Sequence, residues 1–137
     1  VVPKDHKWAD AKEIAMADIM GEPFIIREAG SGSRLVFEQA LIDAEVDVED
    51  LNVIMEIGSI TSIKSAIING LGVSIMSKWA VRDLEKVGIV STLHIKELEL
   101  KRPFSIILNQ GNFESEACNK FIHYLGEVTE KEIFEHI

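Results

Sequence analysis

The chain has 137 residues, which is the size of one ordinary domain and too short for two full-sized ones. Hydrophobic residues make up 47% of it and charged residues 27%, so the chain can build a core and is not expected to be disordered. Its net charge of −9 opposes contact with phosphate backbones, which argues against direct binding of DNA or RNA. No apolar run approaches the roughly 18 residues of a membrane span, so no membrane partner is expected.

Cysteine and histidine usage argues against metal chemistry. The single cysteine, Cys118, excludes an internal disulfide and a metal site built from cysteines, and it fits a reducing, cytoplasmic location. The four histidines lie on separate predicted elements without metal-ligand spacing, so neither a metal nor a cofactor is expected. The chain starts at Val1 rather than at a methionine, and we expect it to be part of a longer protein.

The hydrophobic pattern predicts helices and strands in alternation. The first half should contain the end of a strand at 1–2, a helix at 11–20 capped by Asp10 and ended by Gly21, a buried strand at 24–26, a helix from the turn at 29–33 to about residue 44, and a strand at 53–57. The second half should contain a helix opened by 58–59 and closed by 69–70, a buried strand at 73–76, a helix at 79–84, strands near 89–95 and at 104–108, and a last helix at 115–128. This order predicts an α/β fold with a parallel sheet and right-handed crossovers.

Two of the predicted strand-to-helix turns could bind a ligand. Residues 27–34 contain two glycines, two serines and, in an otherwise acidic stretch, the cation Arg34. Residues 58–62 again place hydroxyl groups in the first turn of a helix. Both turns leave the same end of a parallel sheet, so their donors can converge on one anion. Glycine and serine are also ordinary residues of caps and tight turns, and Arg34 could instead pair with Glu28 or Glu38.

Enzyme motifs are absent from the sequence, and no enzymatic activity is expected. Gly30 and Gly32 lack the third glycine of a dinucleotide fingerprint, and there is neither a phosphate-loop lysine motif nor a Gly-x-Ser-x-Gly elbow. The acidic stretch 43–56 lacks a calcium-loop pattern and is expected to be a solvated connection. Three further side chains have structural interpretations: Trp79 as a core anchor, Cys118 as a small buried hydrophobe, and His123 at the surface or the core edge.

Several segments together resemble the effector-binding domain of LysR-type transcriptional regulators. The segment PFIIREAGSGSR at 23–34 resembles a loop in the second lobe of that family. The segments EIGS at 56–59, IKSAI at 63–67 and GLGVSIMS at 70–77 resemble the helix and strand that follow it, in the same order. VPKDH at 2–6, RPF at 102–104 and the predicted helix at 117–125 complete a match over almost the whole chain. The chain is most similar to the branch with the Gly-Ser-Gly loop, which includes regulators of cysteine and carbon-fixation genes.

The resemblance implies a two-lobed fold like that of type 2 periplasmic binding proteins, with a small effector bound between the lobes. It also implies a homo-oligomer, most simply a dimer. Residues 1–9 would be a crossover strand and hinge, 10–100 the second effector-binding lobe, and 101–137 a return crossover strand with a C-terminal helix. The winged helix-turn-helix that binds DNA, its linker helix and most of the first lobe would precede Val1, so DNA would be bound only through that N-terminal domain.

By the same resemblance, effector contacts from this lobe would come from Ser31, Gly32, Ser33, Arg34, Ser59 and Ser65. Because the two turns offer donors near helix amino-termini, the effector is expected to be a small anion or a carboxylate-bearing metabolite. The alternative is a solute-binding protein of a transport system with the same fold, which a signal segment upstream would indicate. An enzyme on this fold, such as a prephenate dehydratase, would need a reactive constellation, and the sequence offers none.

Overall fold

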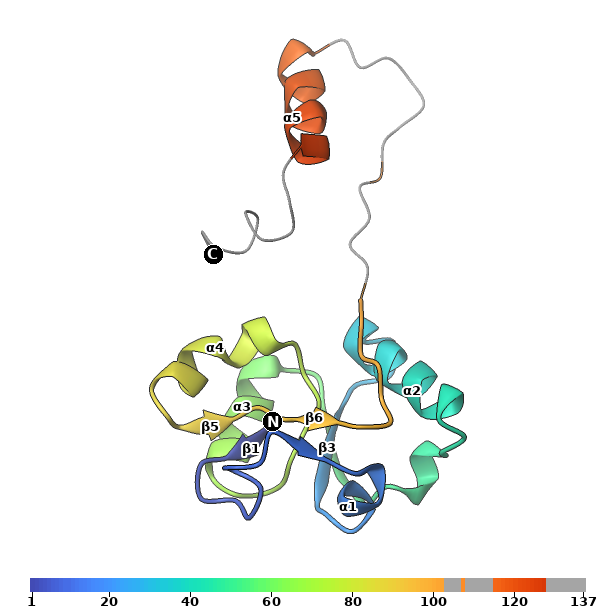
Figure 1. The fold of residues 1–137 in the computed structure, drawn as a ribbon, viewed down its shortest axis with the longest axis vertical. Coiled ribbons are helices and arrows are strands. Elements are labelled where there is room, and N and C mark those ends of the chain that lie inside the picture. The colour runs from blue at the N-terminus through green and yellow to red at the C-terminus, as the bar shows by residue number, and fades with distance from the viewer. Residues whose placement is uncertain (103–106, 108–114, 128–137) are drawn as a thin grey trace. The chain divides into compact units, whose positions relative to one another are not determined.

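A computed structural model of the chain describes residues 1–102, 107 and 115–127 (Figure 1). The chain divides into two units, residues 1–102 and residues 103–137. The first unit contains β1 (Val2–Pro3), β2 (Glu13–Ile14), α1 (Met16–Met20), β3 (Phe24–Arg27), α2 (Gly32–Asp43), the 3-10 helix η1 (Val48–Asp50), β4 (Val53–Ile57), α3 (Ile60–Ile68), α4 (Lys78–Lys86), β5 (Val90–Ser91) and β6 (His94–Ile95). The described part of the second unit contains α5 (Glu116–Glu127). No helix among these residues is long and apolar enough to cross a membrane.

Short parallel pairings organise the first unit. β3 pairs in parallel with β4, and β2 pairs in parallel with β6, while β1 and β5 are antiparallel. On its other edge, β3 forms an isolated parallel bridge between Phe24 and Val73. Helices separate the parallel strands along the chain, so the predicted α/β class with parallel pairing is confirmed.

β3 lies between two hydrophobic clusters because alternate side chains of a strand point to opposite faces. Phe24 and Ile26 belong to a cluster with Phe37 and Leu41 of α2, and the rings of Phe24 and Phe37 stack with centroids 5.4 Å apart. Ile25 belongs to a second cluster with buried residues of α3, α4 and β5. Figure 1 accordingly shows α2 on one side of β3 and α3 and α4 on the other. The predicted strand at 24–26 is therefore buried on both faces, as expected.

The prediction of one helix over residues 11–20 is wrong, because the first part of that segment pairs with β6. The carbonyl of Lys12 accepts from the His94 N–H at 2.9 Å, and the carbonyl of Ile14 accepts from the Lys96 N–H at 3.0 Å. α1 begins only at Met16. The Asp18 carboxylate in its first turn accepts from the N–H of the N-cap residue Ala15 at 2.9 Å. Strand pairing outweighs the helical spacing of the apolar side chains here, and Gly21 ends the helix as predicted.

The predicted strands at 73–76 and 89–95 are shorter than expected. Val73 donates to the Pro23 carbonyl at 2.8 Å and accepts from the Ile25 N–H at 2.9 Å, which is one rung of a parallel ladder. The ladder then stops, because the Ser74 hydroxyl donates to the Ile25 carbonyl at 2.7 Å. Residues 89–95 hold two separate strands, β5 and β6. Of the predicted strand at 104–108, all but Ile107 lies outside the described residues, as does residue 128 of the last helix.

Two glycines have the geometry that the sequence predicts after α3. Gly70 has a φ of +71°, the left-handed conformation expected of the residue that ends this helix. Gly72 allows a close approach, because a Cβ added there would lie 2.5 Å from the Pro23 carbonyl oxygen. Together they let the chain leave α3 and pass directly beside the start of β3.

Two side chains expected in the core are not buried. Trp79 is 46% exposed, and its ring lies 5.3 Å from the guanidinium carbon of Arg82. The buried residue of α4 is Val81, which is two positions from Trp79 and therefore points away from it on the helix. Cys118 is half-buried, and no residue of α5 is fully buried. His123 is at the surface, where its Nε2 lies 3.3 Å from Glu127 Oε1.

Candidate functional site

The amino end of α2 has hydrogen-bond donors without acceptors among the described residues. Ser31 is the N-cap residue, but its hydroxyl does not cap the helix, although the residue is only 8% exposed. The first bonded amide is that of Leu35, which donates to the Ser31 carbonyl at 2.9 Å. The amides of Gly32, Ser33 and Arg34 lie before it and have no intrahelical partner. This end of α2 can therefore donate several hydrogen bonds to an anion.

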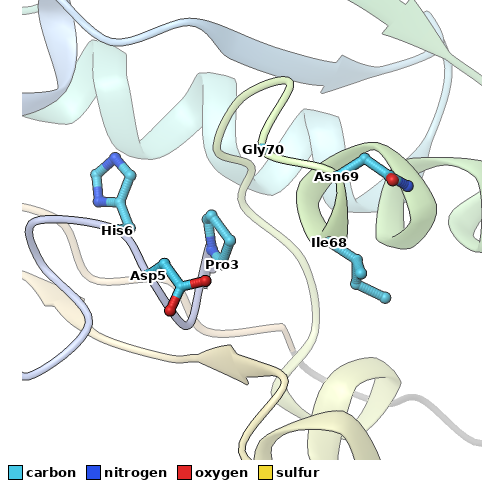
Figure 2. A pocket seen from close by; sticks show the side chains of 6 residues that line it. All are labelled: Pro3, Asp5, His6, Ile68, Asn69 and Gly70. Atoms are coloured by element: carbon cyan, nitrogen blue, oxygen red, sulfur yellow. The ribbon is translucent and has the colours of Figure 1, made fainter.

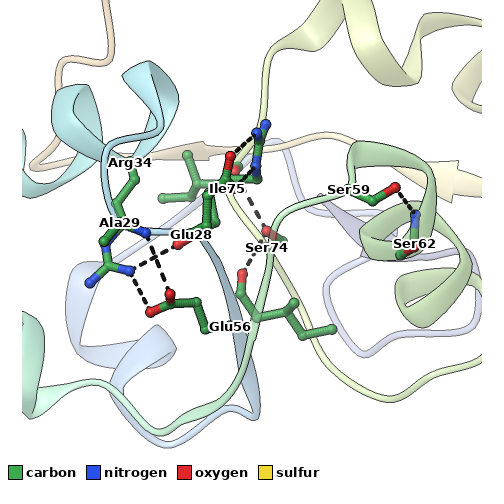
Figure 3. Close-up of polar contacts among 10 residues, drawn as sticks. Glu28, Ala29, Arg34, Glu56, Ser59, Ser62, Ser74 and Ile75 are labelled. Atoms are coloured by element: carbon green, nitrogen blue, oxygen red, sulfur yellow. Dashed lines mark hydrogen bonds and ion pairs between the residues drawn. The ribbon is translucent and has the colours of Figure 1, made fainter.

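The amino end of α3 is more nearly satisfied by its own chain. The Ser59 hydroxyl accepts from the Ser62 N–H at 3.3 Å, as Figure 3 shows. Ser65 lies in the second turn of α3, where it is exposed, and its carbonyl accepts from the Asn69 side chain at 2.7 Å. Its hydroxyl has no hydrogen bond to the described residues. Ser59 thus lies at the start of α3, whereas Ser65 lies further along the helix.

Arg34 is committed to protein acceptors rather than left open. Its Nε donates to Glu38 Oε1 at 2.6 Å, and its Nη1 donates to Glu56 Oε2 at 2.7 Å and to the Arg27 carbonyl at 3.0 Å. The hydrogen bonds that Arg34 donates to Glu38 and, second, to Glu56 raise the pKa of Arg34. The pairing with Glu38 that the sequence left open is thus present, and Glu56 is a second partner that the sequence did not indicate.

Two carboxylates stand between the predicted turns. Glu56 accepts from the Ala29 N–H at 3.4 Å as well as from Arg34, and these two bonds, Arg34 first, hold the pKa of Glu56 below its usual value. Glu28 accepts two hydrogen bonds from the Arg27 guanidinium, at 2.7 and 2.8 Å, which lower the pKa of Glu28. A Cβ added to Gly58 would lie 3.8 Å from the Glu28 carboxylate. The ion pairs therefore bring the turn after β3 and the end of β4 together (Figure 3).

Arg102 contacts the amino end of α2, and sequence reasoning missed this contact. A Cβ added to Gly32 would lie 2.5 Å from one of its guanidinium nitrogens, so the guanidinium rests on the first residue of α2. No carboxylate of the described residues pairs with it within 4.0 Å. A cation beside the positive end of a helix dipole is unfavourable unless an anion lies between them. The motif RPF at 102–104 contained the signal, but nothing in it indicated contact with α2.

The structure therefore brings together a smaller set than the sequence predicted. Ser31, Gly32 and Ser33 form one open donor group with Arg102, and Ser59 lies at the start of the neighbouring helix. In Figure 3 Ser59 lies on the opposite side of the view from Arg34. No metal-binding group of three or more His, Cys, Asp or Glu side chains occurs in the part of the chain that the structure describes.

Two surface cavities lie outside this donor group. One, of about 410 Å³, is lined by Pro3, Asp5, His6, Ile68, Asn69 and Gly70, at the carboxyl end of α3 (Figure 2). The other, of about 300 Å³, lies between α2 and the segment at 99–101. Neither is lined by a predicted effector contact.

Comparison with known proteins decides the family. Residues 1–130 match the model of the LysR substrate binding domain. The chain belongs to this family. It is 30% identical over 128 residues to an uncharacterized HTH-type transcriptional regulator from Methanocaldococcus jannaschii, covering 93% of this chain and 43% of that protein. It is 33% identical over 121 residues to a probable RuBisCO transcriptional regulator from Cyanophora paradoxa, covering 88% of this chain and 37% of that protein.

A solved regulatory domain has the same fold. The regulatory domain of CcmR from Synechocystis PCC6803, in complex with 2-PG, is 28% identical and superposes with a TM-score of 0.70, covering 94% of this chain and 61% of that one. The LysR substrate-binding domain is therefore a periplasmic-binding-protein-like α/β domain here too, as the resemblance implied. Its relatives are transcriptional regulators rather than enzymes, and the chain spans less than half the length of these curated relatives.

Proposed function

We propose that this chain is the effector-sensing part of a LysR-type transcriptional regulator and binds a small anionic or carboxylate-bearing metabolite in an interlobe cleft. The family match and the regulator relatives support the regulatory role. The 2-PG complex of the CcmR domain supports binding of a small ligand and makes 2-PG the first candidate to test. The net charge of −9 fits a division of labour in which another part of the protein contacts DNA.

One observation supports an anionic ligand: the amino end of α2 has free donors and lies against Arg102. The amides of Gly32 and Ser33 and the hydroxyls of Ser31 and Ser33 are hydrogen-bond donors, and no described carboxylate occupies them. The Arg102 guanidinium adds a positive charge that no carboxylate of the described residues pairs with within 4.0 Å. An anion that accepts hydrogen bonds from the amides of α2 and from Arg102 beside them would satisfy both at once.

The predicted contacts contribute unequally in this proposal. Ser31, Gly32 and Ser33 bind the anion directly, and Ser59 contributes from the start of α3. Ser65, exposed in the second turn of α3, is the most peripheral of the six residues. Effector binding changes the relation between copies of the regulator in a homo-oligomer and so controls transcription, without any catalytic step.

An arginine substitution tests the site. Arg102→Gln should abolish the rise in unfolding temperature that increasing 2-PG or inorganic phosphate produces in the wild-type chain, since ligand binding to the folded state stabilises it. Arg82→Gln is the matched control, because Arg82 lies on α4 beside Trp79. Any general salting effect of the anion will act equally on both variants. An equal, saturable rise in Arg102→Gln and Arg82→Gln would refute the assignment.

A further inference from the structure

Glu56 connects three segments around the proposed anion site through one carboxylate. It lies one residue before the end of β4. One of its oxygens accepts from the Ala29 N–H at 3.4 Å, in the turn that leads to Ser31. The other accepts from Arg34 at 2.7 Å, in the first turn of α2. The same carboxylate therefore fixes both the turn that precedes α2 and the start of the helix itself, relative to the end of β4.

The Arg34 guanidinium completes this connection and leaves little room for a ligand. It bonds to Glu38 on α2, to Glu56 on β4 and to the Arg27 carbonyl at the end of β3. Its side chain is only 19% exposed, and those of Glu38 and Glu56 are 29% and 52% exposed. Two carboxylates around one guanidinium give a local charge of −1. An incoming anion would have to displace a carboxylate to reach Arg34 and would meet another beside it.

We propose that Glu56 and Arg34 are positioning residues of the effector site, which hold the amide donors of α2 in place and do not contact the effector. This inference rests on the proposed function, because it needs an anion at the amino end of α2. Arg34 thereby changes role from the ligand contact that the sequence suggested to a support for Gly32 and Ser33. The cation that faces the ligand is Arg102, on a different segment of the chain.

The opposite interpretation is that Glu56 is an internal competitor for the effector. In that case its carboxylate would occupy the place of the ligand on Ala29 and Arg34, and neutralising it would tighten anion binding. In our proposal the same change loosens the turn at 28–31 and weakens anion binding. The direction of the effect of Glu56→Gln therefore separates the two roles.

The experiment is a titration of the isotope-labelled chain with inorganic phosphate, with the dissociation constant read from the amide shifts of Gly32 and Ser33. It compares the wild type with Glu56→Gln, Arg34→Gln and the double variant. Glu22→Gln is the matched control, since Glu22 also pairs with a lysine and a histidine but precedes β3, whereas the site follows it. The Ala29 amide shift without ligand reports directly whether its bond to Glu56 has been lost.

We expect each single variant to raise the dissociation constant of phosphate about threefold or more. The double variant should bind phosphate as tightly as the single variant with the larger loss, because both changes break the same connection. The Ala29 amide should shift in Glu56→Gln, while Glu22→Gln keeps the wild-type affinity. Tighter or unchanged binding in Glu56→Gln, or effects that multiply in the double variant, would overturn the positioning role. If phosphate shifts neither Gly32 nor Ser33 in the wild type, the proposed function fails first.

Discussion

Ser31 and Ser59 occupy the same position at two helix starts but differ in their hydrogen bonds. The Ser59 hydroxyl accepts from the Ser62 N–H, whereas the Ser31 hydroxyl forms no cap bond. Both residues have extended backbone angles, and the sequence identifies both as candidate caps. It cannot tell a filled cap from an open one, because that depends on one side-chain rotamer. Because its cap is open, the amino end of α2 has more free hydrogen-bond donors for an anion than that of α3.

Gly70 gives a test of a single backbone angle. Gly70→Val should lower the free energy of unfolding by more than about 1 kcal/mol, because a β-branched residue adopts positive φ only with strain. Gly21→Val is the control, since Gly21 also ends a helix but has a φ of −89°. An added Cβ meets nothing within 4 Å at either position, so the two variants differ in φ rather than in crowding. Equal urea-unfolding midpoints in the two variants would contradict the assignment.

The ion pairs of Glu22 lead to a prediction of how the stability of the fold depends on pH. Lys7 is its main partner, His6 Nε2 lies 3.4 Å away, and these contacts lower the pKa of Glu22 below 4.5. A carboxyl whose folded-state pKa is depressed stabilises the fold above its unfolded pKa, and this contribution is lost as the pH falls through the folded value. Between about pH 5 and pH 3, Glu22→Gln should therefore lose less unfolding free energy than the wild type. Tryptophan-monitored urea unfolding at both pH values measures this, and an equal loss would argue against the pairing.

At the scale of elements, the sequence predicts well where one period of apolar residues persists. β3, β4 and α2 to α4 occur where the pattern places them, and β4 spans 53–57 as predicted. The failures lie where a distant segment intervenes, as when β6 pairs with residues 12–14 and removes half of the first helix. The contacts of Arg102 and Glu56 were not predicted for the same reason. Arg102 contacts Gly32, 70 positions away, and Glu56 contacts Arg34, 22 positions away. Local spacing carries no information on such contacts.

The buried face of α3 is also narrower than its sequence suggests. α3 carries isoleucines at 60, 63, 67 and 68, but only Ile63 and Ile67 of these are buried, together with Ala66, while Ile60 and Ile68 are 41% and 42% exposed. The buried positions have i, i+3, i+4 spacing. Ile68 follows Ile67 by one residue and so lies about 100° around the helix from it, outside the buried face.

A pair of alanine substitutions tests this face. Ile63→Ala should cost about 2–5 kcal/mol of unfolding free energy, because Ile63 is fully buried against Ile25 and Val81. Ile60→Ala, the same change at an exposed position of the same helix, should cost well under half as much. Chemical denaturation of both variants checks the difference, and comparable losses would show that the face is wrongly assigned.

At the scale of the whole molecule, the negative net charge is compatible with the proposed anion site. The net charge of −9 repels anions at long range, but salt screens this repulsion beyond about 10 Å. Within that range the free amides of α2 and the Arg102 guanidinium favour an anion, while the group of Arg34, Glu38 and Glu56 opposes it with a local charge of −1. An acidic chain can therefore bind a small anion while it remains a poor ligand for nucleic acid.

The exposed apolar side chains of α5 predict self-association. Phe121 is 59% exposed and Ile122 and Leu125 are half-buried. Full burial of an exposed large apolar side chain is worth about 1.5–3 kcal/mol, so an interface that covers this face gains part of that amount for each of them. We expect a concentration-dependent dimer in light scattering, weakened by Phe121→Ser with Leu125→Ser. Lys120→Ser, on the polar side of α5, should leave it unchanged. A monomer at high concentration with α5 still helical would contradict this expectation.

The central claim is that an anion binds at the amino end of α2, and a map of amide shifts tests it most directly. Titration of the labelled chain with 2-PG, sulfate or phosphate should shift the amide signals of residues 30–34 most and that of Ser59 less. The dissociation constant should be about 1 mM, which corresponds to a binding free energy of about −4 kcal/mol. The shifts should vanish in the Ser31→Ala, Ser59→Ala double variant. Shifts confined to other regions, such as the cavity around His6 and Asn69, would contradict the claim.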